Sequence, residues 1–164
     1  MGTDPQLSAF LETLSGSNVL ILGVGNVLKG DDAAGPRVCE RLSGKISAKV
    51  IDAGTAPENH IRPILKPAPD TLLIVDAVDF GGQPGQIRLL GPEQIRKSGL
   101  STHALSLHLF IDVLRREADM DVHLIGIQAG QTRLGDPVSS AVEQAIETLV
   151  DTFCKQFALP NSHE

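Results

Sequence analysis

Apolar residues along the chain fall into short continuous runs that alternate with stretches of helical periodicity. The runs of strand length lie at 19–24, 49–52, 71–76, 86–90 and 121–128. Apolar residues recur every three or four positions in predicted helices at 7–14, 34–42, 56–65, 102–114 and 137–153. This alternation is typical of a three-layer α/β/α sandwich, in which helices cover both faces of a mostly parallel, doubly wound sheet.

Some of these elements carry more detailed expectations. The run Leu72-Leu73-Ile74-Val75 indicates a strand buried on both faces, whereas 86–90 alternates polar and apolar residues like an edge strand. Asp136-Pro137 predicts the start of the last helix, with Asp at the cap and Pro at the first helical position. Thr102 is expected to cap a helix whose apolar positions are Leu105, Leu109, Phe110, Val113 and Leu114.

Length and composition fit one globular domain. The chain has 164 residues, of which 41% are hydrophobic and 21% charged, and domains commonly run to roughly 100–200 residues. We therefore expect a single domain over 1–164 with its core at about 18–157.

Charge and cysteine content exclude several function classes. Lys and Arg number 14 against 20 Asp and Glu, giving a net charge of −6, and no basic cluster is longer than Arg115-Arg116. Nucleic acid and membrane are therefore not expected as partners. No apolar stretch approaches the ~18 residues of a membrane span, so a cytoplasmic location is predicted. Cys39 and Cys154 lie far apart, each in a helical pattern, and both are expected to be buried thiols in a reducing cytosol.

The most informative polar segment follows the first predicted strand. Residues 25–32 contain two glycines, an asparagine and the adjacent carboxylates Asp31 and Asp32. Glycine and asparagine tolerate positive φ, so they let the backbone turn sharply after the strand. Because open α/β sheets keep their sites at the carboxyl ends of the strands, this loop is expected to present oxygen ligands.

A metal site is predicted if the connections between the first three strands are right-handed, as is usual. The strand order would then be two, one, three, which brings Asp31 or Asp32 near Asp76. The loop 98–103 would deliver the His103 imidazole to the same end of the sheet. Two carboxylates and one histidine with open positions suit a divalent transition metal that also accepts ligands from a substrate.

Each of these residues also has a purely structural interpretation. An acidic pair after a Gly-rich turn often only caps the next helix, and Asp76 taken alone fits a solvated or capping carboxylate equally well. His103 taken alone is more typical of a capping or partly buried histidine. The spacing does not show whether Asp79 reaches the same site. The remaining histidines in helix and strand patterns are predicted to be structural: His60, His108 and His123.

Four segments of the chain together resemble a known family. They are Gly25-Asn26-x-Leu28-x-Gly30-Asp31-Asp32-x-x-Gly35-Pro36, Asp52-Ala53-Gly54-Thr55-Ala56-Pro57-Glu58-Asn59, Asp76-Ala77 and Ser101-Thr102-His103. In order and spacing they are similar to the NiFe-hydrogenase maturation endopeptidases, over most of the chain from about residue 18 to residue 157. The Ala-Pro-Glu-Asn stretch and the Thr-His pair resemble the branch that processes the large subunit of hydrogenase 3, of formate hydrogenlyase-type complexes.

The resemblance implies removal of a short C-terminal extension from the hydrogenase large-subunit precursor once nickel is inserted. It places the family's metal-contacting positions at Asp32, Asp76 and His103, and a further carboxylate that shapes or assists the site at Asp52. Asp31 would orient the loop. The nickel would come with the substrate, and no organic cofactor is implied. Ala33 replaces a glycine common after the acidic pair, which affects only the freedom of the loop backbone.

The mechanism and two other function classes stay open at this point. Nickel would either polarise the scissile carbonyl while a carboxylate activates water, or only be recognised so that it positions the bond. A noncatalytic chaperone that checks nickel loading would use the same ligands. A receiver-type Mg²⁺ module ranks lower because 126–131 lacks the required Lys, and a nucleotide-binding fingerprint fails at Leu28.

Overall fold

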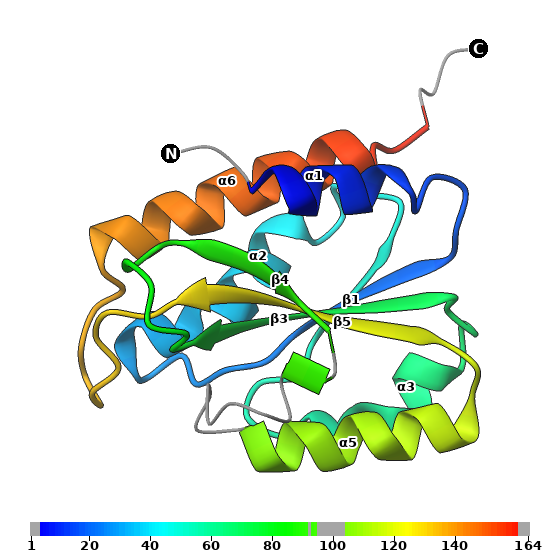
Figure 1. The fold of residues 1–164 in the computed structure, drawn as a ribbon, viewed down its shortest axis with the longest axis horizontal. Helices are drawn as coiled ribbons and strands as arrows, with labels where there is room; N and C mark the ends of the chain where they lie inside the picture. The colour runs from blue at the N-terminus through cyan, green and yellow to red at the C-terminus, as the bar shows by residue number, and fades with distance from the viewer. Residues whose placement is uncertain (1–3, 92, 95–103, 161–164) are drawn as a thin grey trace.

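A computed structural model describes residues 4–91, 93–94 and 104–160, which form a five-stranded sheet between two layers of helices (Figure 1). The strands are β1 (Val19–Gly23), β2 (Lys49–Asp52), β3 (Thr71–Val78), β4 (Ile87–Leu90) and β5 (Asp121–Gln128). The α-helices are α1 (Pro5–Glu12), α2 (Ala34–Leu42), α3 (Ile61–Leu65), α5 (Ala104–Glu117) and α6 (Ser140–Gln156), and the 3-10 helices are η1 (Gly30–Ala33) and η2 (Pro57–His60). The predicted fold class is confirmed.

Apolar side chains are buried on both faces of the sheet. Helices α1, α2 and α6 cover one face, and α3 and α5 cover the other (Figure 1). Every residue of β1 and β3 is buried, as continuous apolar runs predict for parallel strands covered on both sides. The core therefore consists of two apolar clusters with the sheet between them.

The strand order of the sheet is β2-β1-β3-β5-β4. Strands β2, β1, β3 and β5 are parallel, and β4 pairs antiparallel with β5 at one edge. The predicted order of the first three strands is confirmed, as is the edge position of the 86–90 segment. Because β1 and β3 are neighbours, the loops that follow them share the carboxyl edge of the sheet.

The third strand is longer than predicted. It ends at Val78 instead of Asp76, because its pairing with β5 continues as far as Gln128. Asp76 pairs with Gly126 and lies inside the strand. The backbone of Asp76 is therefore fixed by the sheet and is not part of a loop.

The last helix begins later than predicted. The signal at 136–137 does not start it, because α6 begins at Ser140 with Ser139 at the cap. Asp136 instead accepts a backbone hydrogen bond within a turn, and the Ser139 N–H is bound by the Asp31 carboxylate. Contacts with a distant loop therefore override the local start signal.

The buried face of α5 also differs from the prediction. Leu109 and Val113 are exposed, and Thr102, the predicted cap, lies outside the described residues. The stripe that packs against the sheet follows the i, i+3, i+4, i+7 spacing, which places those two residues on the outer side of the helix. Its members are Leu107, Phe110, Ile111 and Leu114.

The two cysteines are free and differ in burial. Cys39 is buried on α2, as predicted. Cys154 is only half-buried, so the expectation of a second buried thiol is wrong. Its neighbour Phe153 takes the buried position of that turn of α6. Among the described helices, none has both the length and the apolar character needed to cross a membrane.

Candidate functional site

The loop after β1 is shaped by glycines that approach other backbone atoms closely. Gly25 has a φ of +154° and Gly30 a φ of +54°, values that side chains disfavour. A Cβ on Gly25 would collide with the carbonyl oxygen of Asp32, and the Gly25 N–H donates to the Gly54 carbonyl at 2.9 Å. The loop therefore folds back on itself and is tied to the loop after β2.

Asp31 joins this loop to the loop after β5. Its fully buried carboxylate accepts hydrogen bonds from the N–H groups of Gly130 (2.7 Å), Gln131 (2.9 Å) and Ser139 (2.7 Å), and from the Ser139 hydroxyl (3.0 Å). The Asp31 N–H donates in turn to the Gln131 carbonyl at 2.7 Å. With this set of partners Asp31 is a positioning residue, which supports the predicted role of orienting the loop.

Asp32 points to a different environment from its neighbour. Its side chain is buried, and its Oδ2 accepts the Asn26 N–H at 2.8 Å. The Asn26 side chain accepts the Leu28 N–H at 2.9 Å, so the asparagine fixes the turn that precedes η1. The loop thus holds the Asp32 carboxylate in one orientation at the carboxyl edge of the sheet.

Asp76 lies on the neighbouring strand with its side chain fully buried. Its neighbours Val75 and Ala77 belong to the cluster under α2 and α6, whereas Ile74 and Val78 belong to the cluster under α5. Because side chains alternate along a strand, Asp76 faces the α5 side. Helix η1, which carries Asp32, packs against β3. The predicted proximity of the two acidic elements at one edge is therefore found.

His103, the third predicted member of the site, lies outside the described residues. Helix α5 begins at the next residue, Ala104, and its first turn lies at the carboxyl edge of the sheet, on the face to which Asp76 points (Figure 1). Within the described part of the chain, no group of three His, Cys, Asp or Glu side chains is placed to hold a metal ion.

Asp52 lies at the carboxyl end of β2 and is exposed. Its Oδ1 accepts the Gly54 N–H at 2.9 Å, in a turn where Gly54 has a φ of +55°. This is a local turn interaction of the kind that aspartate commonly makes. Its backbone is nevertheless linked to the site, since Asp52 pairs with Gly23 of β1.

Asp79 and Gln128 form a separate polar group beyond the end of β3. The exposed Asp79 carboxylate accepts the Gly81 N–H at 3.0 Å and the Gln128 amide at 3.2 Å. These hydrogen bonds, that of Gly81 first, lower the pKa of Asp79. The buried Gln128 also accepts the N–H groups of Phe80 and Gly82. Both side chains therefore organise the turn after β3.

The three histidines predicted to be structural each contact another group of the protein. Desolvation lowers the pKa of His123, partly opposed by Asp121. The contacts are His60 Nδ1 to the Ala56 carbonyl (3.2 Å), His108 Nε2 to Asp112 Oδ2 (3.3 Å) and the His123 ring to the Phe10 ring (4.4 Å between centroids). These contacts fit the structural role predicted for them.

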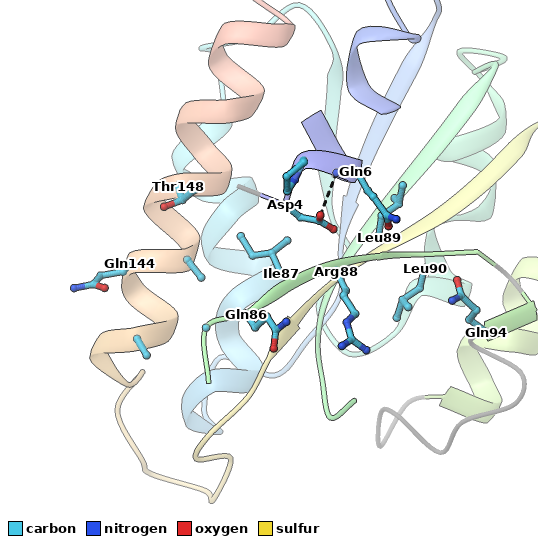
Figure 2. Close-up of a pocket in the computed structure, with 14 residues that line it drawn as sticks. Asp4, Gln6, Gln86, Ile87, Arg88, Leu89, Leu90, Gln94, Gln144 and Thr148 are labelled. Atoms are coloured by element: carbon cyan, nitrogen blue, oxygen red, sulfur yellow. Dashed lines mark hydrogen bonds between the residues drawn. The ribbon is translucent and has the colours of Figure 1, made fainter. Parts of the chain in front are cut away.

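A cavity of about 650 Å³ lies beside the edge strand β4, between the start of α1 and helix α6. Figure 2 shows that polar side chains such as Gln86 and Gln144 surround it, with Ile87 and Leu89 from β4. None of the predicted site residues lines this cavity. The cavity therefore does not coincide with the predicted site.

Sequence reasoning missed the residues that hold Asp31. Ser139 was predicted to lie inside the last helix, and Gly130 and Gln131 were predicted only to follow the last strand. One signal was available: the regular apolar spacing of Val142, Ala145 and Ile146 begins just after Ser139, a favoured cap residue. No pattern in the sequence pairs Ser139 with Asp31, 108 residues away.

Comparison with known proteins gives consistent matches to one group. The HycI hydrogenase maturation protease family model matches residues 36–156. The hydrogenase 3 maturation protease of Escherichia coli (strain K12) is 38% identical over 133 residues, covering 79% of this chain and 85% of that protein. This similarity agrees with the branch indicated by the sequence motifs.

Solved structures agree with the sequence matches. The crystal structure of the HycI NiFe-hydrogenase maturation protease from Thermococcus kodakarensis KOD1 has a TM-score of 0.81 and 30% identity, covering 90% of this chain and 97% of that chain. The hydrogenase maturating endopeptidase HybD from Escherichia coli has a TM-score of 0.70 and 26% identity, covering 82% and 88%. The fold of these proteins therefore extends over most of the chain.

Proposed function

The chain belongs to the hydrogenase maturation protease family, and we propose that it removes the C-terminal extension of a NiFe-hydrogenase large-subunit precursor after nickel insertion. The observation that carries the proposal is the family match over residues 36–156, in a fold that buries Asp32 and Asp76 at one sheet edge. The partner is the precursor protein, and the nickel is part of that substrate. The free thiols Cys39 and Cys154 fit action in the reducing cytoplasm.

We assign recognition of the substrate's nickel to Asp32, Asp76 and His103. Carboxylate oxygen and imidazole nitrogen are suitable ligands for a divalent transition metal, and three of them leave positions for ligands from the precursor. The support in this structure is the placement of Asp32 and Asp76, both buried, on elements that pack together. Such fixed ligands need little reorganisation when the substrate binds.

The proposed cleavage is an aspartic-type hydrolysis that depends on the loaded metal. A carboxylate of the site takes a proton from water, and the resulting hydroxide adds to the scissile carbonyl carbon. The C–N bond then breaks, and the proton passes to the leaving amine. Asp32 and Asp76 are the candidates for this base. Asp52 assists by shaping the loop beside them, through the Gly54 turn that binds Gly25.

The proposal is tested by incubating the protein with nickel-loaded and nickel-free precursor and measuring the intact masses of the products. We expect loss of a C-terminal peptide from the loaded precursor alone. Cleavage of both forms would refute nickel recognition. Binding of the loaded precursor without any cleavage would refute the protease assignment and would instead support a noncatalytic checkpoint for nickel loading.

A further inference from the structure

Three exposed apolar side chains lie on the two loops that carry and hold the acidic pair. Val27 is 54% exposed, Leu28 63% and Leu134 73%. We call these three residues the apolar rim. A single exposed leucine on a surface needs no explanation, but three on linked loops are typical of a binding surface.

The rim is held in place by hydrogen bonds between the two loops. The Gly135 N–H donates to the Leu28 carbonyl at 2.8 Å, which brings the backbone at Leu134 close to that of Leu28. The Leu28 N–H is bound by the Asn26 side chain, and the Asp31 carboxylate joins the loops a few residues further on. Apolar groups on such a preorganised backbone bind a partner with a small ordering cost.

Cations flank the rim in a chain of negative net charge. Lys29 follows Leu28 and Arg133 precedes Leu134, and both are exposed, although the net charge of the chain is −6. Asp136 is the carboxylate on the same turn, and its Oδ2 is engaged by the Arg133 N–H at 3.0 Å. The surface thus combines apolar side chains with positive charge, which favours an apolar partner segment bordered by carboxylates.

We propose that the apolar rim, with Lys29 and Arg133, is the docking surface for the precursor segment beside the scissile bond, an apolar segment flanked by acidic side chains. This inference rests on the proposed function. Asp32 lies three residues after Lys29 in the same tight loop, so a protein whose scissile bond reaches Asp32 also covers the rim. The rim therefore sets affinity for the precursor, while the carboxylates cut it.

The test changes the rim without changing the site. In the double variant Leu28→Ser/Leu134→Ser we expect the KM for nickel-loaded precursor to rise by about tenfold or more, from the lost apolar contacts, with kcat within about twofold. Leu159→Ser is the matched control, because Leu159 is 49% exposed but does not belong to the rim. It follows Ala158, which pairs with Ile46 ahead of the first residue of β2. The control variant should keep the wild-type KM, and both proteins should keep the wild-type Tm.

Charge reversal and direct binding complete the test. Lys29→Glu/Arg133→Glu should also raise the KM and should weaken its dependence on salt. Binding is measured with an Asp76→Asn protein, which should hold the precursor without cutting it. Adding the rim changes to this protein should raise the Kd of the precursor by the same factor as they raise the KM. An unchanged KM and Kd in the rim variants, or a loss confined to kcat, would overturn the docking proposal.

The two proposals fail in different ways. If wild-type protein binds the precursor but does not cut it, and the rim variants bind weakly, the docking surface stands and the protease assignment fails. If wild-type protein cuts the precursor and the rim variants bind and cut it equally well, the docking surface fails alone.

Discussion

The loop after β1 and the end of β2, with the loop that follows it, both place carboxylates at the carboxyl edge of the sheet, yet they hold them differently. The first loop buries Asp31 and Asp32 and ties them to other parts of the chain. The second loop leaves Asp52 exposed, with a hydrogen bond two residues away at Gly54. Fixed, buried carboxylates are typical of a catalytic or metal-binding edge, whereas exposed ones more often only shape a turn.

The largest effect is expected at Asp76, which shares the buried character of the first loop. Asp76→Asn removes the charge but keeps the shape, so processing of nickel-loaded precursor should fall by about 10³-fold or more. The product masses and the Tm measure this. Asp79→Asn is the matched control in the turn after the same strand and should process normally, because Asp79 is exposed. Full processing by a folded Asp76→Asn protein would refute the assigned role.

The next effect tests whether Asp31 is the residue that fixes the first loop. Asp31→Asn places an amide against three backbone N–H donors, which should lower the free energy of unfolding by about 3 kcal/mol. Asp136→Asn is the control, since the Asp136 carboxylate accepts the Arg133 N–H in an ordinary turn, and its cost should stay below about 1 kcal/mol. Urea unfolding measures both, and equal losses would contradict the comparison.

A glycine pair gives a backbone version of the same comparison. Gly25 and Gly54 are hydrogen-bonded to each other and both have positive φ, but a Cβ on Gly25 would collide with the Asp32 carbonyl while one on Gly54 meets open space. Gly25→Ala should cost about 3 kcal/mol and reduce processing, because the collision displaces Asp32. Gly54→Ala should cost about 1 kcal/mol from φ alone. A larger loss for Gly54→Ala would contradict the proposed difference between the loops.

Sequence reasoning located the fold and the acidic edge because both depend on short-range patterns. Continuous apolar runs identify the buried strands, and the winding rule then makes β1 and β3 neighbours, which brings Asp32 and Asp76 to one edge. The additional strand pairing that places Asp76 inside β3 is made with β5, which lies far along the chain. No local pattern contains that information.

The role of Asp31 illustrates the same limit more sharply. Its partners are 99 to 108 residues away, and binding them delays the start of α6 past the Asp-Pro signal. Two adjacent aspartates look equivalent in sequence, so only the three-dimensional contacts separate the positioning residue from the candidate ligand. The contribution of His103 stays a prediction.

A smaller effect is expected at Asp52. Asn in its place keeps an oxygen for the Gly54 N–H, so Asp52→Asn should process precursor within about tenfold of wild type if the residue only shapes the turn. Asp52→Ala, which lacks that oxygen, should fall further. A hundredfold loss in Asp52→Asn, measured as kcat/KM, would instead show that its charge takes part in the chemistry and would remove the contrast between the two loops.

The smallest effect concerns the Cys39 thiol, which contacts the Ile51 carbonyl of β2 next to Asp52. Burial, and then the negative charge of Asp52, raise its pKa to about 12 from 9.0. At pH 8.5 roughly 0.03% of it is thiolate, so iodoacetamide should alkylate half-buried Cys154 long before Cys39. Because the unfolded thiol ionises near 9.0, this group lowers stability as pH rises from 9 toward 12.

Asp52→Asn should lower the Cys39 pKa and speed its alkylation only slightly, since burial is the larger cause of the raised pKa. Peptide mass mapping against time measures both rates. A rate for Cys39 equal to that of Cys154 would show that α2 opens readily, and the rigidity assigned to the neighbouring first loop would then have to be abandoned.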